Sequence, residues 1–172
     1  MTVTPNRPLS DGPLTAFSTP SDLEFKAVRQ FDAPKQLLFD AHTKPEHVQQ
    51  WMTGPDGWTM PVCEIDLRVG GAWRFVWRRE GGSEMEMNGE YREITPYDRL
   101  VTTESWGGPW PPTVNTVDFV EQDGKTTLTM TIRYPSREAR DAATATGMTS
   151  GMNTSYNRLA AHVTASHIER AS

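Results

Sequence analysis

The sequence predicts an α+β domain in which a curved antiparallel sheet of about seven strands wraps around a long C-terminal helix. Three observations predict this fold class. A first strand pattern is followed by two short helical segments, then by a run of strand patterns joined by short turns, and finally by an apolar stripe with helical spacing. Because the strand patterns come in a run instead of alternating with helices, a parallel α/β sheet is excluded.

The N-terminal segment, residues 1–20, contains four prolines and little periodicity, so we expect a flexible arm there. A single domain is expected over residues 21–172, since 172 residues suit one domain of ordinary size. No stretch resembles a signal peptide or approaches the roughly 20 apolar residues of a membrane helix. A cytoplasmic location is therefore expected.

The first strand is predicted over residues 23–31, where apolar and polar residues alternate. Asp32 is expected to cap the helix that follows, with Pro34 in its first turn, where a missing N–H costs nothing. A second short helix is expected from Pro45 to Trp51.

Glycine turns then divide the middle of the chain into an antiparallel meander. Two strands, residues 114–120 and 126–134, are joined by Asp123-Gly124, a pair that favours a tight hairpin. After Pro135 a helical segment begins near Ser136, and a stripe with spacings of three and four predicts the closing helix. Its members are Met148, Met152, Tyr156, Leu159 and Val163. Gly147 and Gly151 indicate either the helix start or the close approach of a backbone or ligand.

One strand of the meander has an aromatic face, because Trp73, Phe75 and Trp77 alternate with smaller or charged residues. Such a face either fills the core or lines a cavity for an apolar molecule. Several of the eight methionines fall on predicted inward faces, and their flexible thioethers suit both interpretations. The candidate ligand-binding residues are Trp73, Phe75, Trp77, Met85, Met87, Tyr91, Met130, Ile132, Met148, Met152 and Tyr156. Four tryptophans beside glycine-containing loops are candidates for the rim or lid of that cavity: Trp51, Trp58, Trp106 and Trp110. For Trp51 and Trp58 the alternative is a structural role, packing the short helices onto the sheet, and this is the preferred interpretation of Trp51.

Other functions find little support in the sequence. The net charge of −5 disfavours nucleic acid as a partner. The single cysteine, Cys63, is expected to be buried and inert. His162 and His167 are five residues apart, unlike the pairs of zinc sites, so neither a metal nor a cofactor is expected.

No catalytic residue is assigned, although acid and base chemistry has three candidates. Glu64 and Asp66 share one face of a strand, as paired carboxylates would, and Tyr91 supplies a phenol. The other interpretation of the two carboxylates is structural, with Arg68 and Arg74 as their ion-pair partners.

Several motifs of the sequence are informative as a set: Phe31-Asp-Ala-Pro34, Asp66-Leu-Arg-Val-Gly-Gly71, Gly89-Glu-Tyr91, Pro96 to Leu100, and Gly147-Met-Thr-Ser-Gly-Met152. Together they resemble the bacterial proteins related to the C-terminal domain of the heat-shock protein 90 ATPase activator, in the START-like (SRPBCC), birch-allergen-like superfamily. The resemblance spans roughly residues 23–163. It implies a helix-grip fold with an apolar cavity between the sheet and the long helix, although fold does not give function.

The preferred function is therefore binding of a small hydrophobic or amphipathic molecule between the sheet and the C-terminal helix. Two alternatives stay open: an enzyme of the cyclase or hydrolase kind in the same cavity, and a co-chaperone that regulates a chaperone ATPase. A homodimer formed through sheet edges or tryptophan-rich loops is a further alternative.

Overall fold

The computed structural model describes residues 15–171. Its eight strands form one antiparallel sheet in the order β1-β2-β8-β7-β6-β5-β4-β3. The strands are β1 Ala16–Ser21, β2 Glu24–Phe31, β3 Trp58–Ile65, β4 Ala72–Arg79, β5 Glu84–Thr95, β6 Arg99–Glu104, β7 Thr113–Gln122 and β8 Lys125–Arg133. The helices are α1 Lys35–Thr43, α2 Pro45–Trp51, α3 Arg137–Thr144 and α4 Met148–Ala171.

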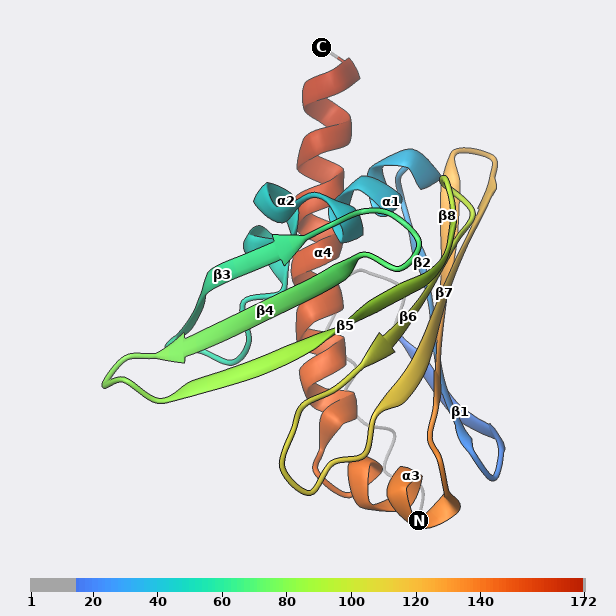
Figure 1. The fold of residues 1–172 in the computed structure, drawn as a ribbon. Helices are drawn as coiled ribbons and strands as arrows, with labels where there is room; N and C mark the ends of the chain where they lie inside the picture. The colour runs from blue at the N-terminus through green and yellow to red at the C-terminus, as the bar shows by residue number, and fades with distance from the viewer. Residues whose placement is uncertain (1–14, 172) are drawn as a thin grey trace, which may run out of the picture.

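The sheet curves around α4, and α1 and α2 lie beside the same helix (Figure 1). This confirms the predicted fold class. The additional strand is β1, which pairs with β2 and lies partly within the predicted flexible arm, so residues 16–20 are a sheet edge and not an arm. Residues 1–14 lie outside the described part of the chain. No helix within residues 15–171 has the length and hydropathy of a membrane span.

The start of α1 differs from the prediction. Pro34, not Asp32, is the N-cap residue, and no side chain of the cap residue bonds to the helix. Instead, the Lys35 backbone N–H donates to Oε1 of Glu121 at 2.8 Å. A carboxylate from the end of β7 therefore satisfies a free amide of the first turn and complements the positive end of the helix.

The remaining local predictions are confirmed with one change. α2 runs from Pro45 to Trp51, and Asp123 and Gly124 both have positive φ, as a tight hairpin turn requires. The Ser136 side chain caps α3 by accepting from the Ala139 N–H. The change is that α3 and α4 are separate helices, divided just before α4 at Gly147, where φ is +79°.

The C-terminal helix α4 packs against the core through a narrow stripe of side chains. Tyr156, Leu159 and Val163 are buried, and Met148 and Met152 are partly buried against the same core. Burial of such side chains contributes roughly 1.5–3 kcal/mol each. Gly151 faces open space, since a Cβ there would meet no heavy atom within 4 Å, so close packing does not explain this glycine.

Gly89 of β5, in contrast, is required by close packing. A Cβ built on Gly89 would lie 1.8 Å from the Thr103 carbonyl oxygen and 2.9 Å from Cζ2 of Trp73. The obstruction includes the backbone of β6, which cannot rotate away as a side chain can.

His42, on α1, packs against α2 and the sheet. Its ring centroid is 5.0 Å from that of Trp51 and 5.3 Å from that of Phe119, and its Nδ1 bonds to the Leu38 carbonyl at 2.7 Å. Burial lowers its pKa from 6.5 to about 4, so the ring is neutral in the folded protein near neutral pH.

We expect Gly89→Ala to lower the free energy of unfolding by on the order of 3 kcal/mol, because the new methyl group collides with backbone. Gly151→Ala is the matched control, and it is expected to raise stability by up to about 1 kcal/mol, since alanine favours an exposed helix. Urea denaturation measures both changes. Equal unfolding midpoints for the two variants would contradict the packing described for Gly89.

Acid should destabilise the fold through His42. The unfolded chain takes up a proton at this residue below pH 6.5, whereas the folded chain resists it down to about pH 4, so stability is lost as the pH falls through that window. Replacing His42 by Gln should reduce the loss of unfolding free energy between pH 7 and pH 4 by at most about 3 kcal/mol. Thermal denaturation across pH measures this, with the exposed His167→Gln as control. An unchanged acid dependence in His42→Gln would refute it.

Candidate functional site

All eleven predicted ligand-binding residues meet in one hydrophobic cluster on the concave side of the sheet. Seven of them are buried: Trp73, Phe75, Trp77, Met87, Tyr91, Ile132 and Tyr156. The other four, Met85, Met130, Met148 and Met152, are partly buried against that core. The alternation along β4 and β5 is therefore confirmed. The helix stripe and the strands pack together in one hydrophobic cluster, and the eleven residues in it are called the candidate surface below.

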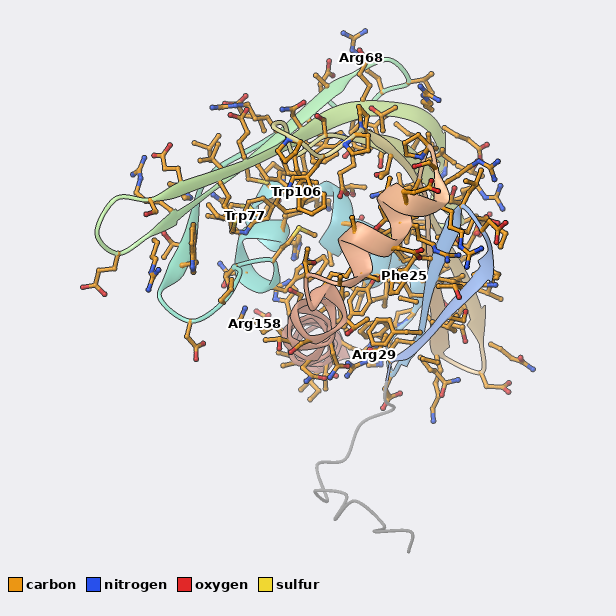
Figure 2. The ribbon with its side chains drawn as sticks, turned by 90° about the horizontal axis from the view of Figure 1, so that it is seen from below. Phe25, Arg29, Arg68, Trp77, Trp106 and Arg158 are labelled. Carbon is orange, nitrogen blue, oxygen red and sulfur yellow. The ribbon has the colours of Figure 1, made fainter. Side chains whose placement is uncertain are left out.

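The aromatic face of β4 continues onto the loop after β6. The ring centroids of Trp73 and Phe75 are 4.9 Å apart, and those of Phe75 and Trp77 are 6.2 Å apart. Trp77 stacks on Trp106 at 5.5 Å with an interplanar angle of 12°. Figure 2 shows the two residues together on the side of the sheet that faces α4. Trp106 is 44% exposed, so it borders the aromatic surface, as a rim residue would.

Two of these indoles differ in how their N–H groups are satisfied. Trp77 Nε1 donates to the Met52 carbonyl at 2.7 Å. Trp73 Nε1 is buried and has no hydrogen-bond partner among the described residues. A buried donor without an acceptor costs about 1–3 kcal/mol, so it requires an explanation.

A carboxyl group also faces this surface. Oε1 of Glu104 accepts from Trp106 Nε1 at 2.8 Å, and Oε2 accepts from Asn115 Nδ2 at 2.5 Å. The side chain of Thr113 donates in turn to Asn115 Oδ1 at 2.8 Å. Burial raises the pKa of Glu104, and its two hydrogen bonds oppose this rise. Glu104 thus connects Trp106 to strands β6 and β7.

Sequence reasoning missed Glu104. The signal was its place at the end of β6 in the same alternation phase as the buried Leu100.

The three candidates for acid and base chemistry do not form one site. Glu64 and Asp66 are exposed and pair with Arg74 and Arg68, at 3.5 Å and 2.8 Å, which confirms the structural interpretation of these carboxylates. Tyr91 is buried within the core, and burial raises its pKa, so its hydroxyl stays protonated. The side chain of Cys63, the neighbour of Glu64 in β3, packs against the same core as Tyr91. Because successive residues of a strand point to opposite faces, Glu64 points away from Tyr91.

Arg29 is the polar group on this side that sequence reasoning passed over. It stands on β2 between the buried Ala27 and Phe31 and is itself only 5% exposed. Nη1 donates to Asn157 Oδ1 of α4 at 2.7 Å and to Thr15 Oγ1 at 3.5 Å, whereas the buried Nε has no partner among the described residues. Burial lowers its pKa from the ordinary arginine value. A charged residue in the apolar phase of a strand was the available signal.

Other polar groups offer less. Nδ1 of His47 lies 2.8 Å from Nε2 of His162. The pKa of His162 is lowered mainly by burial and to a smaller extent by the charge of His47. Within residues 15–171 no three side chains of the metal-binding types gather as a metal site. Cys63 is half-buried, and burial raises its pKa to about 12, so its thiol stays protonated and unreactive.

A surface hollow of about 440 Å³ lies away from this cluster, where α1 begins beside strands β5 to β7. Its two cationic side chains already pair with carboxylates. Lys35 Nζ is 2.6 Å from Asp98 Oδ1, and Arg99 Nε is 2.7 Å from Asp118 Oδ1.

Solved structures share this fold. A protein from Rhodobacter sphaeroides is 28% identical, with a TM-score of 0.84 over 88% of this chain and 99% of that chain. One from Chromobacterium violaceum is 25% identical, with a TM-score of 0.70 over 81% and 96% of the two chains. An Hsp90 activator from Plasmodium falciparum is 24% identical, with a TM-score of 0.50 over 66% and 74%, which shows similarity of fold alone.

The sequence comparisons agree with the fold. No curated protein is similar enough in sequence to count as a relative. Residues 32–164 match the family described as activator of Hsp90 ATPase homolog 1-like protein. Since the match covers more than half of this chain, the chain belongs to this family.

Proposed function

We propose that the protein binds a small apolar molecule that carries a hydrogen-bond acceptor, held between the concave face of the sheet and α4. The observation that carries this proposal is the buried Trp73 N–H, which has no acceptor among the described residues. The side chain belongs to the hydrophobic cluster, whose hydrocarbon side chains cannot accept a hydrogen bond. A carbonyl or ether oxygen of a ligand would satisfy this donor and remove the cost of leaving it unpaired.

The composition of the surface supports the same conclusion. Met85, Met130, Met148 and Met152 are only partly buried at the edge of the cluster, and unbranched thioethers adapt to apolar guests of different shape. The stacked Trp106, held by Glu104, lies where such a guest would enter. Apolar surroundings with a few placed polar groups are the usual composition of small-molecule sites.

Comparing a ketone with its hydrocarbon tests the role of the Trp73 N–H. We expect 2-decanone to quench tryptophan fluorescence saturably and to bind the wild type more tightly than decane does. In Trp73→Phe the preference for the ketone should fall by about threefold to tenfold, because one hydrogen bond contributes roughly 0.5–1.5 kcal/mol. Calorimetric titration gives the affinities.

Trp51→Phe is the matched control for this experiment, since the Trp51 N–H already donates to the Ala41 carbonyl at 2.8 Å. It should cost stability and leave the ketone preference unchanged. If neither compound binds and native mass spectrometry of the purified protein finds no bound small molecule, the proposal is refuted.

A second candidate function, stimulation of a chaperone ATPase, is favoured by the family match over residues 32–164. The structural feature available for protein contact is the loop between β6 and β7, where Trp106 and Trp110 are 44% and 39% exposed. Exposed aromatic side chains are enriched at protein interfaces.

This second function predicts a faster ATPase rate when the chain is added to a purified bacterial Hsp90. Trp110→Ser should then abolish the stimulation, because truncating an aromatic contact commonly costs more than 2 kcal/mol of binding. Val120→Ser is the control, since Val120 is an exposed apolar residue of β7 outside the loop. An unchanged ATPase rate with the wild-type chain ends this candidate.

A further inference from the structure

We propose that the guanidinium of Arg29 binds the carboxylate of an amphipathic ligand whose apolar part lies on the concave face. This inference rests on the proposed ligand-binding function and names the class of ligand: an apolar carboxylic acid in its ionised form.

The first argument is charge compensation. Buried ionic groups are almost always paired, because an unpaired charge loses its hydration without compensation. Arg29 is 5% exposed, and no carboxylate among the described residues forms an ion pair with it. Arg140, the other buried arginine of the described chain, follows the rule: it pairs with Asp141 at 2.9 Å and donates to the Ser21 carbonyl at 2.6 Å.

The second argument is the geometry of the unused donors. Asn157 and Thr15 occupy Nη1 only, and both are neutral. Nε is buried without a partner, and Nη2 makes no hydrogen bond to a described residue. Nε and Nη2 form one edge of the guanidinium, whose two parallel N–H groups match the two oxygens of a carboxylate. The free edge is therefore a complete donor pair for one planar oxyanion.

The third argument is location. The Arg29 guanidinium lies 5.5 Å from the ring centroid of Phe31, and Tyr156 of the candidate surface is close enough for the arginine charge to oppose the rise of its pKa. The Tyr156 ring packs edge to face on Phe31 at 6.1 Å and stacks with Trp51 at 6.3 Å. The guanidinium of Arg29 and Tyr156 of the candidate surface are thus neighbours, as the head and tail of one amphipathic acid require. Figure 2 shows Arg29 and the Trp77–Trp106 pair on different sides of α4.

The test compares decanoate, decanol and acetate at pH 7.5 in the wild type and in Arg29→Met, which keeps an unbranched apolar stem without the charge. We expect the wild type to bind decanoate about tenfold more tightly than decanol, as a bidentate charged pair contributes more than a neutral hydrogen bond. In Arg29→Met the affinities for decanoate and decanol should become equal. Calorimetric titration gives the affinities.

Two controls separate this role from a structural one. Arg140→Met removes the compensated buried arginine, so it should lower the melting temperature and keep the decanoate preference. Ligand-free Arg29→Met should melt no lower than the wild type, since it removes an uncompensated buried charge. The proposal is overturned if Arg29→Met melts at a lower temperature than the wild type and the wild type binds decanoate and decanol with equal affinity.

The remaining outcomes distinguish this inference from the proposed function. Decanol binding without a decanoate preference overturns the Arg29 inference and leaves the ligand-binding function standing. Binding of neither compound, with no ligand from the ketone experiment, refutes the proposed function. Stabilisation of the wild type by acetate or inorganic phosphate, equal to that by decanoate and absent in Arg29→Met, assigns Arg29 to free anions and overturns the amphipathic ligand.

Discussion

The constraint on which the rest of the structure depends is that α4, together with the short helices α1 and α2, must cover the concave face of a wide sheet. Eight strands at about 4.8 Å spacing extend far beyond the roughly 10 Å width of a helix. The sheet therefore curves toward α4, and its outer strands need large side chains to reach the helix. This accounts for the row of Trp73, Phe75 and Trp77 on β4 and for the methionines of β5 and α4. Core filling and the proposed ligand binding draw on the same residues.

Polar groups on that face fall into two kinds. Glu104 is fully engaged, since Trp106 and Asn115 each donate to one of its oxygens. Trp73 and Arg29 each keep a buried donor that no described residue satisfies. An engaged group holds the fold together, whereas an unused donor lowers stability for as long as it stays unpaired. The two unused donors are therefore the residues at which this chain departs from what folding alone would favour.

Local patterns in the sequence predicted much of this architecture. Alternation placed the aromatic face of β4 correctly, Pro45 set the start of α2, and Asp123-Gly124 set the β7–β8 turn. The failures concern contacts between distant residues. The cap of α1 comes from Glu121, 86 residues away from Lys35, and β1 is a strand because it pairs with β2. For the same reason the sequence revealed neither that Arg29 lacks a counter-charge nor that Glu104 has two donors, since both facts depend on what surrounds a side chain after folding.

The two edges of the sheet bear on self-association. Each outermost strand contains a proline, Pro20 in β1 and Pro61 in β3, and the pairing register of each shifts near it. Proline has no N–H to donate, and an irregular edge presents no continuous row of free backbone groups. A second copy of the chain therefore finds no regular template for extending the sheet at either side. These two irregular edges therefore disfavour a dimer that shares one continuous sheet.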